Sequence, residues 1–164
     1  MVADHQLLNM IKKFIFTITF CLFTQVSFAA GGDSGSDTSN PQKDAQNFVK
    51  RGKKLESKGK NEKALKLYNK AYEKLLEANK ADSRNPDILN YLGFTLRKAG
   101  KYEQAEKYYL QGLEIKPNHD GINEYLGELY VKTNRIDLAK ERLEVLKNCK
   151  CEEYQELKEA IGNK

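Results

Sequence analysis

Two cysteines close to the C-terminus, Cys149 and Cys151, are the side chains of this sequence best suited to chemistry. Three interpretations of the segment Cys149-Lys150-Cys151 remain open. A disulfide would pin the turn, although a ring with one intervening residue is near the limit of disulfide geometry. A thiolate pair would bind Cu(I) or take part in thiol exchange. In the third interpretation both are ordinary small residues, one of them buried at a helix junction.

The rest of the sequence contains no arrangement typical of catalysis. A zinc enzyme needs about three protein ligands, and the chain of 164 residues has only two histidines. His119 falls in a turn between expected helices, and neither Ser57 nor Ser83 has a base nearby in the pattern. No glycine-rich phosphate loop follows a strand, because no strand is expected. The sequence therefore predicts a protein that is not an enzyme and that uses no cofactor and no metal.

The first 29 residues have the three parts of a secretory signal peptide. Lys12 and Lys13 are the positive part, 14–23 is an apolar run, and Ser27-Phe28-Ala29 places small residues before a cleavage point. The run is short for a bilayer span, which takes about 20 apolar residues. We therefore expect a bacterial protein exported to the periplasm, with Met10 as a possible true start. The alternative is an inner-membrane anchor formed by an uncleaved segment.

Charge is distributed unevenly after the expected cleavage. The net charge of the whole chain is +5, and residues 30–164 retain 26 basic and 22 acidic residues. Residues 50–66 have a net charge of +6, whereas residues 137–164 have a net charge of −1. A basic end would meet an acidic partner or anionic lipid, although a solvated lysine-rich face is the more common case. Nucleic acid is not expected as a partner of an exported chain.

A repeat begins after residues 30–43, which are small and polar and are expected to form a disordered linker. Three units start at Ala45, Pro86 and Asp120. They share glycine at place eight, a residue that tolerates left-handed φ at place fifteen, and alanine at place twenty. The residues at these places are Gly52, Gly93 and Gly127; Gly59, Gly100 and Asn134; and Ala64, Ala105 and Ala139. Each unit is therefore predicted to be a helix, a tight turn and a second helix.

The middle unit, 86–117, resembles the tetratricopeptide repeat, a 34-residue helix–turn–helix motif. It has the pair Leu92-Gly93, with Ala105, Tyr109 and Pro117 at the expected places and Leu89 in place of the usual tryptophan. The resemblance implies an all-α fold of stacked hairpins in a short right-handed superhelix. We expect a repeat domain at 44–161, with units 45–85, 86–119 and 120–150 and a capping helix at 151–161. The seven extra residues of the first unit are placed in a longer second helix, 60–79.

The first helix of each unit is expected to line a concave face that binds a peptide or protein. The residues predicted to contact the partner share places on that face: Lys50, Lys53, Asn90, Tyr91, Phe94, Arg97, Glu124, Tyr125 and Glu128. Exposed aromatic rings would anchor a peptide. In the alternative interpretation, Tyr91 and Phe94 only fill space between adjacent helices. The leading hypothesis is a non-catalytic adaptor of the bacterial cell envelope. Its alternatives are a redox or metal-handling factor that uses the cysteine pair, and a structural protein that self-associates.

Overall fold

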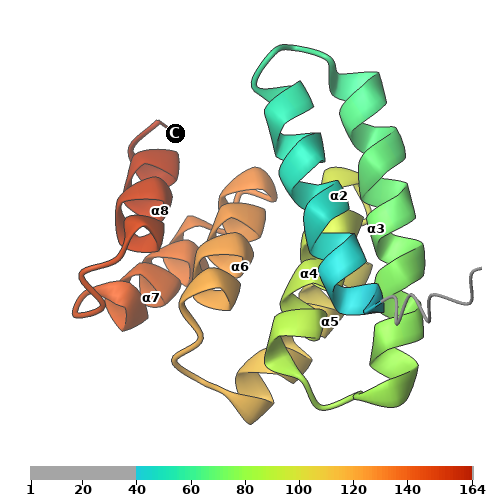
Figure 1. The fold of residues 1–164 in the computed structure, drawn as a ribbon. Coiled ribbons are helices and arrows are strands. Elements are labelled where there is room, and N and C mark those ends of the chain that lie inside the picture. The colour runs from blue at the N-terminus through green and yellow to red at the C-terminus, as the bar shows by residue number, and fades with distance from the viewer. Residues whose placement is uncertain (1–39, 164) are drawn as a thin grey trace, which may run out of the picture. The chain divides into compact units, whose positions relative to one another are not determined.

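The computed structural model describes residues 40–163, and all of them lie in one compact unit. The expected signal peptide and most of the expected linker lie outside the described residues. Within 40–163 the chain forms seven helices and no strand (Figure 1). Their bounds are α2 Pro41–Glu56, α3 Asn61–Ala81, α4 Pro86–Lys98, α5 Tyr102–Ile115, α6 Asp120–Lys132, α7 Ile136–Leu146 and α8 Glu152–Gly162. None of these helices is both long enough and apolar enough to span a bilayer.

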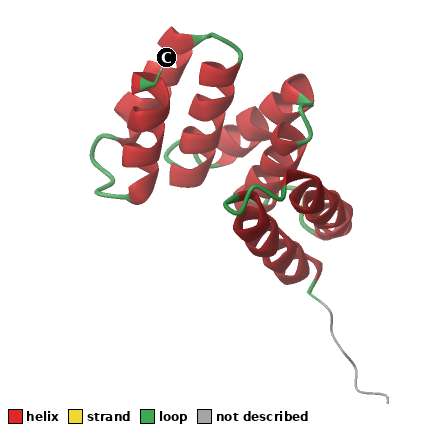
Figure 2. Cartoon of the chain, turned by 90° about the horizontal axis from the view of Figure 1, so that it is seen from above, coloured by secondary structure: helices red, strands yellow, loops and turns green. Residues whose placement is uncertain are grey.

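Short loops connect the helices of each predicted unit, so the all-α repeat fold is confirmed (Figure 2). The pairs α2–α3, α4–α5 and α6–α7 are the three hairpins, and α8 packs against both α6 and α7. The residues at place fifteen have the left-handed conformation that the turn requires, with φ of +69° at Gly59, +75° at Gly100 and +61° at Asn134. Glycine and asparagine adopt this region at low steric cost.

Two boundaries differ by two or more residues from the sequence prediction. Helix α2 begins at Pro41, whereas the linker was expected to continue to residue 43. The Asn40 side chain accepts a hydrogen bond from the Lys43 amide at 3.1 Å, and a proline at the first helical position has a suitable φ. Helix α3 extends from Asn61 to Ala81, so the extra residues of the first unit do lengthen its second helix, two residues beyond the predicted end.

The central glycine of each hairpin lies against a large side chain. A methyl group on Gly52 would come within 2.3 Å of the Tyr68 ring, and one on Gly93 within 2.4 Å of the Tyr109 ring. In the third hairpin the side chain opposite Gly127 is Leu157, which comes from α8. The glycines therefore allow close helix contacts, and α8 completes the third hairpin.

Candidate functional site

A groove of about 510 Å³ opens between the hairpins, where the C-terminal ends of α2, α4 and α6 meet α8. Its walls combine charged and small apolar side chains from five helices. They are Glu56 of α2, Arg97 and Lys98 of α4, Tyr102 of α5, Glu128, Val131 and Lys132 of α6, and Ala160 of α8. Arg97 and Glu128 are thus the two predicted contact residues that line this groove.

An aromatic cluster lies next to the groove and includes the predicted anchor Phe94. The Phe94 ring makes an edge contact with Tyr68, with ring centroids 5.3 Å apart, and a tilted contact with Tyr125 at 5.1 Å. Phe94 is only 1% exposed. Its predicted role as a partner contact is therefore wrong, because a ring enclosed by two others offers no surface. Phe94 instead supports the groove from within the core.

Three cationic side chains stack on the same aromatic cluster. Lys53 Nζ lies 5.3 Å from the Phe94 centroid and 5.1 Å from that of Tyr125, where it also donates a 2.6 Å hydrogen bond to the hydroxyl. The Arg97 guanidinium and the Lys98 ammonium lie 5.7 and 5.5 Å from the Phe94 centroid. Contacts of this kind contribute about 0.5–2 kcal/mol each and fix the long cationic chains in place.

Acidic partners pair with two of these cations along the groove. Arg97 forms a salt bridge with Glu128, and Lys98 Nζ lies 2.8 Å from a Glu56 carboxylate oxygen. The other oxygen of Glu56 accepts a 2.7 Å hydrogen bond from the Tyr68 hydroxyl. Burial alone would raise the pKa of Glu56, but the hydrogen bonds from Lys98 and Tyr68 outweigh it and lower the pKa. The groove therefore presents fixed, alternating charges.

Glu124 lies on α6 facing α8 and differs from the other acidic residues. It is 2% exposed, and its Oε1 has no hydrogen-bond partner within the described chain. Burial, a hydrogen bond with Glu156 and repulsion from Glu128 raise the pKa of Glu124 to about 10. The side chain is therefore protonated and uncharged at neutral pH. The prediction that Glu124 contacts a partner is wrong, because the side chain is enclosed by the interface between α6 and α8.

The remaining predicted contact residues lie at different depths. Asn90 is 7% exposed, so it offers a partner little surface. Tyr91 is half-buried against the core around Phe94, and burial raises the pKa of its hydroxyl. Lys50 is exposed on α2. Helix periodicity alone does not show how deeply neighbouring hairpins cover each of these residues.

Some groove residues are not among the predicted contact residues. Four of them lie at places twelve and thirteen of the repeat, at the ends of the first helices: Glu56, Lys98, Val131 and Lys132. The repeat pattern also expects these two places to face the concave side. Ala160 had no such signal, because its contribution depends on where the capping helix docks.

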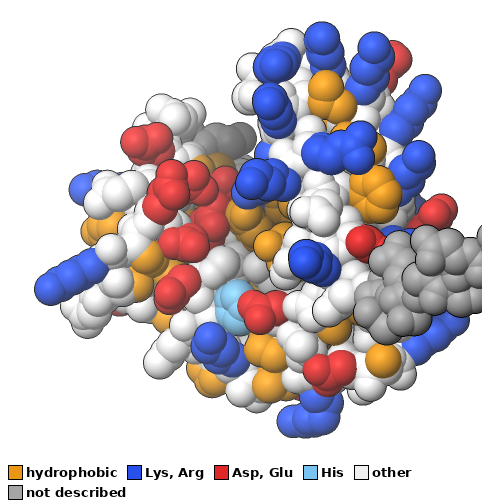
Figure 3. Space-filling view, in the orientation of Figure 1, with side chains coloured by type: hydrophobic (Ala, Val, Ile, Leu, Met, Phe, Trp, Pro, Cys, Tyr) orange, Lys and Arg blue, Asp and Glu red, His pale blue; other side chains and the backbone are white. Residues whose placement is uncertain are grey.

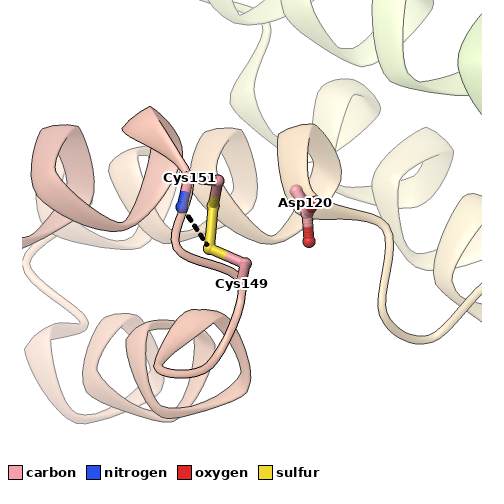
Figure 4. Close-up of side chains that lie close together, drawn as sticks. All are labelled: Asp120, Cys149 and Cys151. Atoms are coloured by element: carbon pink, nitrogen blue, oxygen red, sulfur yellow. Dashed lines mark hydrogen bonds between the residues drawn. A yellow bond between two sulfur atoms is a disulfide. The ribbon is translucent and has the colours of Figure 1, made fainter.

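The two cysteines form a disulfide in the turn between α7 and α8. Cys149 Sγ accepts a 3.2 Å hydrogen bond from the Cys151 amide. The carboxylate of Asp120, the first residue of α6, lies opposite the disulfide (Figure 4). One carboxylate oxygen and the two sulfurs all lie within 4.8 Å of one another. This cluster is separate from the groove and involves none of its lining residues.

Surface charge differs between the two ends of the repeat domain. Residues 41–81, which form α2 and α3, contain twelve basic and five acidic residues. Residues 120–163, from α6 to α8, contain seven basic and ten acidic residues. The space-filling view shows Lys and Arg gathered over α2 and α3 and acidic side chains gathered over α6 and α8, with some of the exposed hydrophobic side chains between them (Figure 3).

The stacked hairpins define an all-α helical-repeat protein. Residues 86–119 match the family model described as the tetratricopeptide repeat. The matched residues comprise α4, α5 and the loop after them, so this hairpin is similar to a tetratricopeptide repeat. No curated protein is similar enough to count as a match.

Several solved structures are similar to part of this chain. A tetratricopeptide repeat protein from Parabacteroides merdae aligns with 16% identity over 74% of this chain and 61% of its own, with a TM-score of 0.50. The TPR domain of Arabidopsis OM64 aligns with 12% identity over 75% of this chain and 98% of its own, with a TM-score of 0.49. The second TPR domain of human RPAP3, solved with an HSP70 peptide, aligns with 22% identity over 76% and 99%, with a TM-score of 0.47.

Proposed function

We propose that the chain is a non-catalytic adaptor of the bacterial cell envelope that binds a peptide or protein in the groove between α2, α4, α6 and α8. The observation that carries this proposal is the groove itself, which has a preformed aromatic base and charges held in place on both sides. Side chains fixed before binding lose little conformational entropy on binding, which favours recognition of a partner. The signal-peptide pattern of residues 10–29 supports export to the periplasm.

The charge arrangement indicates what kind of segment fits. The cations Lys98 and Lys132 and the acid Glu128 lie beside the small apolar residues Val131 and Ala160. The best-fitting segment therefore combines a short apolar side chain with a charged or amide group. The apolar side chain would be buried against Val131 and Ala160, and the polar group would pair with the charged side chains beside them. Electrostatic complementarity of this kind contributes mainly to specificity and to the rate of association.

A pair of matched double variants tests the proposal. Lys98→Ala with Lys132→Ala removes two cations from the groove and leaves the buried Phe94 in place. The control, Lys74→Ala with Lys107→Ala, removes the same charge from α3 and α5 outside the groove. Binding partners from an envelope extract are quantified by mass spectrometry, and the strongest is then purified and measured by calorimetry.

We expect the groove variant to weaken the purified complex by roughly tenfold or more, which corresponds to about 1.4 kcal/mol. The control variant should bind as the wild type does. Equal affinity for all three proteins would mean that the partner binds elsewhere on the surface. Circular dichroism of both variants checks that the helices remain folded.

A further inference from the structure

We infer that Cys149, Cys151 and Asp120 form a Zn²⁺ site when the disulfide is reduced, and that the disulfide closes this site. The inference is independent of the proposed groove. Its basis is that two distant segments bring three potential ligand atoms together: the turn between α7 and α8 supplies the sulfurs, and the start of α6 supplies the carboxylate (Figure 4).

The fold positions these ligands through backbone contacts. The Cys149 amide donates a 3.1 Å hydrogen bond to the Leu146 carbonyl, which ends the α7 helix. Lys150 has φ of +53°, and this reversal brings the Cys151 amide to Cys149 Sγ. Cys151 is the N-cap residue of α8, where the helix dipole favours a thiolate over a thiol. Reduction of the bond therefore leaves two sulfurs held on one side of a fixed turn.

The distances suit a tetrahedral ion. Zn–S bonds of about 2.3 Å and Zn–O bonds of about 2.0–2.2 Å place neighbouring ligand atoms roughly 3.5–3.8 Å apart. The three atoms already lie within 4.8 Å of one another. The sulfurs must separate beyond a covalent bond length, and a small rotation of either cysteine side chain suffices. The fourth position is left for water.

The set of ligands selects among metals. Two thiolates with one carboxylate match Zn²⁺, which is of borderline softness, whereas Cu(I) prefers sulfur alone and Mg²⁺ and Ca²⁺ prefer oxygen alone. The neighbouring His119 is not available as a ligand. Its Nδ1 accepts the Ile122 amide at 3.2 Å, and its Nε2 lies 3.0 Å from an Asp87 carboxylate oxygen.

Both steps of the switch balance chemically. A dithiol reductant transfers two electrons and two protons to the protein disulfide, so that the reductant becomes a disulfide and Cys149 and Cys151 become thiols. Binding of Zn²⁺ then releases both thiol protons to solvent as the two Zn–S bonds form. Reoxidation by the disulfide form of such a dithiol returns the two electrons to it together with two protons from solvent, so that Cys149 and Cys151 become a disulfide again and the ion loses both thiolate ligands.

Cobalt is the probe for the test, because thiolate-bound Co²⁺ has a near-ultraviolet charge-transfer band and tetrahedral Co²⁺ has strong visible bands. The purified chain is reduced with a dithiol, desalted without oxygen and titrated with Co²⁺, and Zn²⁺ is then added in competition. We expect one ion per reduced chain with both bands, displacement by Zn²⁺, and no binding to the oxidised chain.

Two aspartate variants decide the role of the carboxylate. Asp120→Asn should weaken binding at least about 10-fold, since even residues that only orient a ligand contribute 10–100-fold. Asp137→Asn is the control, because Asp137 lies in the first turn of α7 and its side chain is fully exposed. The inference is overturned if the reduced chain binds no Co²⁺, if the charge-transfer band is missing, or if Asp120→Asn binds as tightly as the control.

Discussion

The first two hairpins and the third hairpin close around their central glycine in different ways. In α2–α3 and α4–α5, a tyrosine from the second helix of the same hairpin covers the glycine. In α6–α7, Leu157 of α8 covers Gly127. The first two hairpins are therefore complete as pairs, whereas the third depends on a separate helix that is joined through the disulfide turn.

The polar groups inside these contacts differ as well. The tyrosines bring hydroxyls into the interior, beside the cations that stack on Phe94. The interface between α6 and α8 instead encloses Glu124, whose charge is suppressed by burial. The cap of this stack thus encloses a carboxyl group that must be protonated, whereas the first two hairpins close over tyrosine rings.

The largest effect on stability is expected when the equivalent glycines Gly93 and Gly127 are each replaced by alanine. In Gly93→Ala the new methyl would meet the fully buried Tyr109 ring at 2.4 Å, and neighbouring hairpins prevent the ring from moving. We expect a loss of about 3 kcal/mol in the free energy of unfolding, measured by urea denaturation. Gly127→Ala meets Leu157 at 2.5 Å, but α8 is terminal and can shift, so about 1 kcal/mol is expected. Equal losses would mean that α8 is as rigidly held as an interior helix.

The next largest effect is the pH dependence of folding stability that comes from protonation of Glu124. Because the folded-state pKa of about 10 exceeds the ordinary value of 4.5, the folded state binds the extra proton between these limits. The stability that this proton provides is complete below about pH 4.5 and is lost as the pH rises toward 10. The nearby charged groups are Glu156, Glu128 and Lys53, of which only Lys53 favours ionisation.

Glu124→Gln should therefore remove most of this pH dependence. We expect the variant and the wild type to be similar in urea denaturation at about pH 5, and the variant to be more stable by on the order of 2 kcal/mol at about pH 9. Glu159→Gln on the exposed side of α8 is the matched control and should follow the wild type. Parallel pH profiles for all three proteins would show that Glu124 ionises normally.

The repeat spacing was enough to predict the hairpins and their turns. The tight turn of every unit needs a residue with left-handed φ at the end of the first helix, and Gly59, Gly100 and Asn134 have it. The start of α2 was missed because a cap at Asn40 depends on local geometry outside the repeat. Spacing also predicted small residues at helix crossings, without showing that Leu157 would cover the third glycine.

The candidate site was predicted only in part. Arg97 and Glu128 line the groove as expected, because the helix face was identified correctly. Phe94 and Glu124 have the same periodicity but are enclosed by neighbouring helices, and enclosure is a property of tertiary packing. For the cysteine pair the sequence left three interpretations, since it does not show whether the turn brings the two sulfurs together. The structure has them bonded.

The smallest expected effect distinguishes the two tyrosines that cover glycines. Tyr68 donates a 2.7 Å hydrogen bond to Glu56, which is ionised and also holds Lys98. Tyr68→Phe should therefore cost about 1 kcal/mol in urea denaturation and raise the pKa of Glu56. Tyr109 lies near Arg97, but its hydroxyl is buried without a well-formed hydrogen bond to any residue in 40–163. Tyr109→Phe should then be neutral or slightly stabilising, because a buried hydroxyl without a partner is unfavourable. A loss in Tyr109→Phe as large as that in Tyr68→Phe would show instead that the Tyr109 hydroxyl accepts a hydrogen bond from Arg97 in solution.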